Sequence, residues 1–145
     1  MTDEPNQKQI SLKGKNILLT GGTTGIGRAI GILLAKSGAN IFTFGREQQP
    51  LDEALQAFKE AGGNAYGFTA DVSKVEDVKR IFQEADKIFD KLDILICNAG
   101  LAAQGLADTP EDEWRYVVET NLLGYLACSK EGITRMKPNK MAISC

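Results

Sequence analysis

The sequence predicts an α/β fold in which helices cover both faces of a doubly wound parallel sheet. Short apolar runs alternate along the chain with longer stretches whose apolar residues recur every three or four positions. A glycine-rich run from Thr20 to Gly27 separates the first apolar run from the first helical stretch. Strands that alternate with helices in this way form parallel sheets, because each right-handed crossover brings the chain back to the same end of the sheet.

The expected strands are short apolar runs bounded by glycine or polar residues. Four of them cover residues 16–20, 40–44, 65–69 and 94–97, and residues 141–144 begin a fifth. The expected helices carry their apolar side chains on one face. They run from Ile26 to Ser37, from Leu51 to Phe58, from Val75 to Phe89 and from Glu111 to about Arg135.

Length and charge limit the classes of protein and partner. The 145 residues suit one domain, which we expect over residues 11–145, after a polar and mobile leader over residues 1–10. The net charge of −2 gives no basic surface for nucleic acid or for an anionic membrane. No apolar run approaches the roughly 18 residues that a membrane span needs. We therefore expect neither nucleic acid nor a membrane as a partner.

The cysteine and histidine content excludes several kinds of site. The three cysteines, Cys97, Cys128 and Cys145, lack the spacing of metal ligands, so no metal is expected. A sparse and odd set of cysteines suits reduced thiols, and therefore a cytoplasmic location. The sequence has no histidine, which excludes a Ser-His-Asp triad and a histidine-ligated metal.

The glycine-rich run is the first candidate binding site. Its glycines let a ligand or a second backbone segment approach closely, and the N–H groups of the helix that follows attract an anion. A strand, a glycine turn and a helix N-terminus in this order form the pyrophosphate site of a dinucleotide-binding fold. The residues expected to bind the cofactor here are Thr20, Gly21, Thr23, Thr24, Gly25, Ile26 and Gly27.

The end of the second strand bears on the choice of cofactor. A carboxylate at this place would accept a hydrogen bond from the ribose 2′-hydroxyl of NAD(H). This chain has Gly45 followed by Arg46. A guanidinium matches a 2′-phosphate in charge and in geometry, so we expect NADP(H) to be preferred over NAD(H). The alternative is that Arg46 is an ordinary solvated surface residue.

A carboxylate follows the third strand. Asp71 is placed to accept a hydrogen bond from the adenine amino group, with the backbone of Val72 beside it. Asp71 or Ser73 also suits the N-cap of the helix that begins near Lys74. The two roles are compatible, and both stay open from the sequence.

Two asparagines follow the fourth strand. Asn98 precedes Ala99 and Gly100, whose small size lets the backbone pass close to a cofactor, while the Asn98 side chain can fasten the strand end. An ordinary strand-to-loop turn is the alternative for these three residues. Asn121 is in step with the apolar residues of the last helix, so its amide needs a partner. That partner is either the backbone or a functional water.

These motifs resemble those of the classical short-chain dehydrogenase/reductase family, from about Ser11 to the C-terminus. The resemblance rests on Thr-Gly-x-x-x-Gly-x-Gly at 20–27, on Asp71, on Asn-Ala-Gly at 98–100 and on Asn121. Cys97 departs from the family's usual Asn-Asn-Ala-Gly. The resemblance implies a Rossmann fold and hydride transfer between NAD(P)(H) and a small-molecule carbonyl or alcohol. It also implies that an arginine placed like Arg46 accompanies NADP(H).

The resemblance extends only partly to catalysis. The family uses an Asn, a Ser, a Tyr and a Lys, and the matching positions here are Asn121 for the Asn and Ser144 for the Ser. No tyrosine of this chain is followed four residues later by lysine, as the family's Tyr-x-x-x-Lys requires. We therefore expect a sheet truncated after the fifth strand, bare apolar surface on that strand and on the last helix, and a chain inactive alone. The full-length form is expected to be a homodimer or homotetramer.

Two other interpretations stay open. The chain can be a dinucleotide-binding module without catalysis that serves in regulation or assembly. A methyltransferase on a similar sheet is the third class, but it would favour an acidic residue at the end of the second strand, where this chain has Gly45 and Arg46.

Overall fold

The computed structural model describes residues 10–105 and 107–137. In this part of the chain four strands, all parallel, form one sheet in the order β3-β2-β1-β4. They are β1 (Asn16–Thr20), β2 (Asn40–Gly45), β3 (Asn64–Thr69) and β4 (Ile94–Ile96). The four expected strands are thereby confirmed. The expected leader, apart from Ile10, and the expected fifth strand at 141–144 lie outside the described residues.

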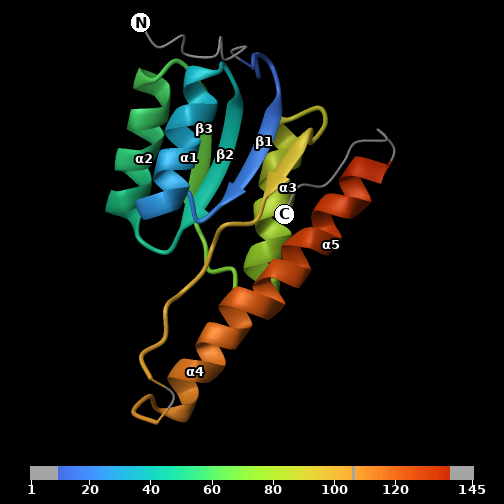
Figure 1. Ribbon diagram of the computed structural model, residues 1–145. Helices are drawn as coiled ribbons and strands as arrows, with labels where there is room; N and C mark the ends of the chain where they lie inside the picture. Colours follow the sequence, from blue (N-terminus) through green and yellow to red (C-terminus); the bar gives the residue numbers. More distant parts are fainter. Residues whose placement is uncertain (1–9, 106, 138–145) are drawn as a thin grey trace, which may run out of the picture.

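Helices cover both faces of this sheet, as the doubly wound fold requires (Figure 1). The helical elements are α1 (Gly25–Lys36), α2 (Gln48–Glu60), α3 (Val75–Ile88), α4 (Glu111–Val118), η1 (Glu119–Gly124) and α5 (Tyr125–Met136). Helices α1 and α2 pack on one face, and α3 and α5 pack on the other. Within the described residues every helix is too short or too polar to cross a lipid bilayer.

The alternation of side chains along β1 produces two separate cores. Ile17 and Leu19 point to one face and pack with Phe58 of α2. Leu18 points to the other face and packs with Phe82 of α3 and Cys128 of α5. All six side chains are fully buried. The three consecutive apolar residues in the middle of β1 are therefore explained by helices on both sides of the strand.

A row of asparagines fixes the register of three strands at their amino ends. The Asn40 side chain donates to the Asn16 side-chain oxygen at 2.9 Å, and the Asn64 side chain donates to that of Asn40 at 2.8 Å. The same three residues are register partners in the sheet. Because the strands are parallel and of similar length, their carboxyl ends also meet at one edge, which is where the candidate residues lie.

The helix expected over residues 111–135 is present, with a difference in its middle. Elements α4, η1 and α5 follow one another without a break, and η1 is a π-helical turn that no periodicity in the sequence indicated. This continuous helix projects past the carboxyl ends of the strands (Figure 1). Helix α4, at the projecting end, buries none of its residues.

The prediction of which face of this helix is buried was wrong. We expected Asn121 to lie on it, but the buried residues are spaced four apart on another face: Thr120, Gly124, Cys128, Gly132 and Met136. Gly124 and Gly132 let the helix approach Val72 and Leu95 closely. Small residues, rather than large apolar ones, therefore determine which face of the helix is buried. Asn121 is exposed, and Leu122, Leu123 and Leu126 keep about half of their surface exposed. The expectation of bare apolar surface on this helix is met in the described residues.

Candidate functional site

A cavity of about 370 Å³ lies where the carboxyl ends of the strands meet the projecting helix. It brings together most of the residues expected to bind a cofactor: Gly21, Thr23, Thr24, Gly25, Ile26, Gly27, Arg46, Asp71, Val72, Asn98, Ala99 and Gly100. Leu101, at the start of the loop expected to line part of the site, is also in its wall, together with residues not named as cofactor-binding from the sequence: Phe44, Gly45, Ala70, Tyr116 and Thr120. Most of the missed residues adjoin expected ones in the chain, whereas Tyr116 comes from a separate helix, α4.

The turn from β1 into α1 is packed too tightly for side chains at Gly21, in the loop, and at Gly27, in the first turn of α1. Gly21 has φ of +66°, and a Cβ there would lie 2.8 Å from the Ala99 Cα. A Cβ on Gly27 would collide with the Gly21 carbonyl and lie 2.5 Å from the Asn98 side-chain nitrogen. The backbone of the loop therefore packs directly on the segment after β4, and both segments line the cavity.

Hydrogen bonds from uncharged groups fasten this loop to β4. The Thr20 hydroxyl accepts from the N–H groups of Asn98 at 2.8 Å and Ala99 at 2.9 Å. The Asn98 side chain donates back to the carbonyls of Thr20 and Gly21. Asn98 thus fastens the strand end as expected. Thr20, which we expected to contact a cofactor, is 2% exposed and lies behind the cavity rather than in its wall.

The other side of the loop is fastened to β2. The Thr43 hydroxyl donates to the Leu19 carbonyl at 2.7 Å and accepts from the Gly22 N–H at 3.1 Å. Thr23 packs against Gly45, where a Cβ would lie 2.5 Å from the Thr23 Cγ2. Gly45 therefore leaves room for the loop beside the end of β2, just before Arg46.

The N-terminus of α1 faces this cavity and carries no negative charge of its own. Thr24 is the N-cap residue, yet its side chain caps no N–H, and the first turn contains no acidic residue. Gly25, Ile26 and Gly27, which open the helix, line the cavity. Unsatisfied N–H groups and the helix dipole together favour an anion at this place.

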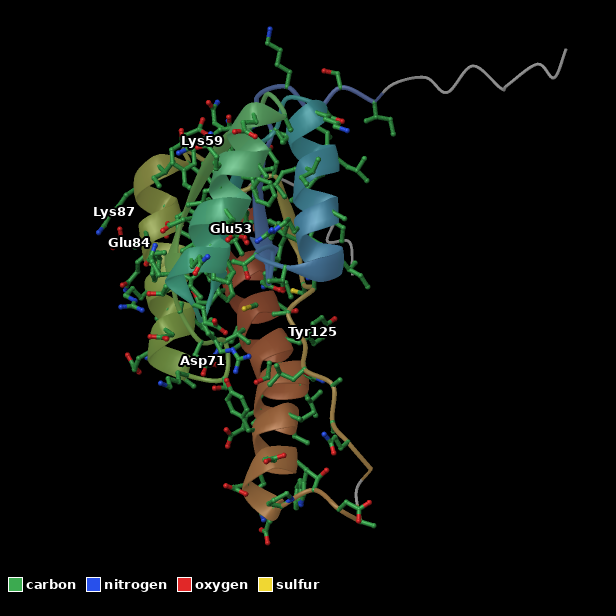
Figure 2. All side chains as sticks on the ribbon, turned by 90° about the vertical axis from the view of Figure 1, so that its left-hand side faces the viewer. Glu53, Lys59, Asp71, Glu84, Lys87 and Tyr125 are labelled. Carbon is green, nitrogen blue, oxygen red and sulfur yellow. The ribbon has the colours of Figure 1, made fainter. Side chains whose placement is uncertain are left out.

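Asp71, Tyr116 and Arg46 form a polar chain at one end of the cavity. The Tyr116 hydroxyl donates to the Asp71 carboxylate at 2.8 Å, and the Arg46 guanidinium donates to the Tyr116 oxygen at 3.1 Å. The Arg46 guanidinium carbon also lies 5.8 Å from the centre of the Tyr116 ring. Figure 2 shows Asp71 at the end of the sheet region that faces the projecting helix.

The Asp71 carboxylate is held in its charged form. Burial alone would raise its pKa, but hydrogen bonds from the Ser73 hydroxyl, the Ser73 N–H and the Tyr116 hydroxyl outweigh burial and lower the pKa. Neither Asp71 nor Ser73 caps α3, because the N-cap residue is Lys74. That alternative was wrong: the Asp71 carboxylate bends back onto Ser73 in a local turn instead.

Asn121 is satisfied by backbone. Its side-chain oxygen accepts from the Leu101 N–H at 2.7 Å, and its side-chain nitrogen donates to the Leu101 carbonyl at 2.8 Å. The backbone partner, one of the two that the sequence left open, is therefore confirmed. The pair fastens the loop after β4 to η1, and Leu101 in turn lines the cavity. Ser144, the other candidate catalytic residue, lies outside the described residues.

A second cavity of about 80 Å³ lies behind the first, between Thr20, Val72 and the buried face of η1 and α5. The hydroxyl of Thr120 is buried there without a hydrogen-bond partner among the described residues. Burial raises the pKa of the adjacent Cys128 thiol to about 12, so this thiol stays protonated. Across the described part of the chain, no cluster of His, Cys, Asp or Glu suits a metal ion.

Comparison with known proteins places this geometry in a family. The short chain dehydrogenase family model matches residues 15–142. A 3beta-hydroxysteroid dehydrogenase from Mediterraneibacter gnavus is 36% identical over 131 residues, which are 89% of this chain and 48% of the relative. The chain spans about half the length of the curated relatives it matches.

Solved structures agree in fold. An NADH-dependent reductase, A1-R′, in complex with NAD is similar with a TM-score of 0.79 and 33% identity, over 88% of this chain and 54% of that one. A variant of actinorhodin polyketide ketoreductase with NADPH has a TM-score of 0.83 and 30% identity, over 90% and 51%. Since the family model covers most of the sequence and these folds agree with the sheet and cavity described above, the chain belongs to the short-chain dehydrogenase family.

Proposed function

We propose that this chain carries the cofactor-binding part of an NADP(H)-dependent oxidoreductase that interconverts a carbonyl and an alcohol by hydride transfer. The pyrophosphate would lie at the N-terminus of α1, where the first helical residues line the cavity and the first turn has no carboxylate to oppose an anion. The bare backbone of Gly21, Gly25 and Gly27 gives a dinucleotide the close approach that it needs. The adenosine would lie toward Asp71 and Arg46.

The observation that carries the choice of NADP(H) is the end of β2. Gly45 leaves no carboxylate to accept from a ribose 2′-hydroxyl, and the exposed Arg46 guanidinium stands on the cavity wall. Among the described residues, Arg46 forms no ion pair, so its charge is available to a 2′-phosphate. The similar solved structures include complexes with NAD and with NADPH, so the cofactor has to be measured for this chain.

The reaction would take place at the opposite end of the cavity, beside Leu101. When bound there, the nicotinamide supplies or accepts the hydride. The Asn121 amide would hold the Leu101 backbone in place by its two hydrogen bonds, and the loop that Leu101 opens would form one wall for a small carbonyl or alcohol substrate. Ser144 is the proposed hydroxyl of the catalytic set, to be joined by a Tyr-x-x-x-Lys that this sequence does not contain.

Binding of the two reduced cofactors to the purified chain tests the proposal. We expect NADPH to bind at least about tenfold more tightly than NADH, because a charge-assisted bond to phosphate adds about 1.5–3 kcal/mol. Arg46→Ala is expected to weaken NADPH and leave NADH unchanged. The matched control is Arg115→Ala, since Arg115 is an exposed arginine paired with Glu111 on α4, outside the cavity. Equal affinities for NADPH and NADH would exclude the NADP(H) assignment.

A second candidate is a dinucleotide-binding module without catalysis. The observation that favours it is the absence of a lysine four residues after any tyrosine in the sequence. Both candidates predict cofactor binding, and both predict no carbonyl reduction by the 145-residue chain alone. Supplying the Tyr-x-x-x-Lys segment by fusion to the second half of a homologous reductase separates them, because only the first candidate predicts turnover in the fusion.

The full-length protein is proposed to be a homodimer or homotetramer. Leu122, Leu123 and Leu126 give η1 and α5 an exposed apolar surface of the kind that subunit contacts cover. Sedimentation of the full-length protein tests this, and a purely monomeric species would contradict it.

A further inference from the structure

Arg46 stands between two hollows, and its direction decides what it can bind. On one side lies the cavity lined by the glycine loop. On the other lies a smaller hollow of about 270 Å³, which Arg46 shares with Asp71, Lys74 and Asp77. Arg46 is exposed, and a long arginine side chain gives up much rotamer freedom when it is fixed in one direction. A contact within the fold therefore has to fix the hollow toward which the Arg46 guanidinium points.

The smaller hollow contains strong competitors for the guanidinium. Its two carboxylates are those of Asp71 and Asp77, and the lowered pKa of Asp71 keeps that group charged. Asp77 is already paired with Arg80 at 3.2 Å. Asp71 is therefore the carboxylate toward which Arg46 would turn, and a direct Arg46–Asp71 pair would neutralise the charge that a phosphate needs.

Tyr116 stands between this cation and this anion. Its hydroxyl donates to the Asp71 carboxylate and accepts from Arg46, so one neutral group occupies the place of a direct ion pair. Its ring lies within cation–π range of the Arg46 guanidinium and lines the larger cavity. Only one guanidinium nitrogen is engaged among the described residues, which leaves the remaining N–H donors for a ligand.

We infer that Tyr116 is a positioning residue for selectivity: its hydroxyl keeps Arg46 apart from Asp71 and directs the guanidinium to the 2′-phosphate of the cofactor's adenosine. This inference rests on the proposed function, because it assumes that Arg46 binds that phosphate. By this inference a residue of α4, 70 positions along the chain from Arg46, contributes to the selectivity for the cofactor.

The test compares two adenosine fragments that differ only in the 2′-phosphate, adenosine 2′,5′-bisphosphate and 5′-AMP. Tyr116→Phe removes the hydroxyl and keeps the ring. We expect it to weaken the bisphosphate about five- to tenfold, the value of one hydrogen bond, and to change 5′-AMP by less than about twofold. Tyr66→Phe makes the same chemical change on β3, at a residue outside the linings of both hollows, and is expected to change neither affinity. A merely structural role for Tyr116 would weaken both fragments equally.

Each result of this titration has one interpretation. A ratio of the two affinities that is unchanged, or raised, in Tyr116→Phe overturns the inference, and so does an equal loss for both fragments. If Arg46→Ala lowers the ratio while Tyr116→Phe does not, the inference fails and the proposed function stands. If Arg46→Ala leaves the ratio unchanged, the NADP(H) assignment itself fails. Circular dichroism and the urea midpoint of each variant show whether the fold is kept.

Discussion

Helices α1 and α3 occupy equivalent places in the fold, but their first turns differ. Each follows the carboxyl end of a strand, α1 after β1 and α3 after β3, and neither has a side-chain cap. The first turn of α1 has no acidic residue, whereas that of α3 has Glu76 and Asp77. The Asp77 carboxylate also accepts a hydrogen bond from the Asp71 N–H at 2.8 Å. The chain thus closes one helix terminus with its own carboxylates and leaves the other open to an external anion.

The open terminus depends most strongly on Gly27. Gly27→Ala places a methyl group against the Gly21 carbonyl and the Asn98 side chain, neither of which can move without breaking the loop's hydrogen bonds. We expect the free energy of unfolding to fall by about 3 kcal/mol, as in other overpacked sites, and dinucleotide binding to be lost. Urea unfolding measures the first and a fluorescence titration the second. The control is Gly105→Ala, where the nearest atom is 3.9 Å from the added Cβ.

The next largest effect is expected when the first turn of α1 is given an acidic residue, as the first turn of α3 has. Ile26 is 76% exposed in the first turn, so Ile26→Glu adds a carboxylate without disturbing the core. We expect NADPH to bind about tenfold more weakly, because a like charge opposes the pyrophosphate at short range. Ile26→Gln, of the same size but uncharged, is expected to bind within about twofold of the parent chain. Identical affinities for the Glu and Gln variants would show that no phosphate lies at this terminus.

Removing a carboxylate from the first turn of α3 tests the other half of the comparison. Asp77→Asn keeps an acceptor for the Asp71 N–H but removes the charge that favours the helix start. We expect a loss of about 1 kcal/mol in unfolding free energy, with NADPH affinity unchanged. Asp52→Asn on α2 provides the control, since Asp52 is exposed and accepts only from Gln48 among the described hydrogen bonds. A change in NADPH affinity with no change in stability would reverse the roles of the two termini.

The smallest expected effect is on the free energy of unfolding at acidic pH. Because the folded state lowers the pKa of Asp71, its carboxylate contributes stability above the unfolded-state pKa of about 3.9, and this contribution is lost as the pH falls through the lower, folded-state pKa. We expect the parent chain to lose more stability than Asp71→Asn between pH 6 and about 3. Urea midpoints over this range measure the difference, with Asp112→Asn on exposed α4 as control. Parallel curves for the parent chain and Asp71→Asn would contradict the lowered pKa.

Local patterns predicted the sheet and most of the cavity. The run Asn16 to Thr20 is a strand as expected, and its three consecutive apolar residues, Ile17 to Leu19, require cover on both faces. The glycine loop, Arg46, Asp71 and Asn98 to Gly100 follow strands, and parallel strands bring whatever follows them to one edge. These residues lie close together because of the order of strands and helices, which short-range sequence patterns predict well.

Features set by contacts between distant segments were missed. The sequence placed Asn121 on a buried face because apolar residues surround it, but Gly124 and Gly132 decide which face approaches the sheet. A single π-helical turn leaves no periodic signal, so η1 was not foreseen. Tyr116 meets Asp71 across 45 positions and Arg46 across 70, and no local pattern pairs them.

The fastening of the glycine loop has a consequence for how the protein responds to its medium. The groups that fasten the loop to β2 and to the segment after β4 are two threonine hydroxyls, one asparagine amide and backbone N–H and C=O groups. None of them gains or loses a proton between mild acid and mild alkali, and none forms an ion pair that added salt would screen. The Arg28 guanidinium, which donates to the Thr23 carbonyl at 2.7 Å, also keeps its charge over this range. The shape of the loop is therefore constant across these conditions. Any dependence of dinucleotide affinity on pH or ionic strength would report the ligand's phosphates and the charged side chains at the adenosine end.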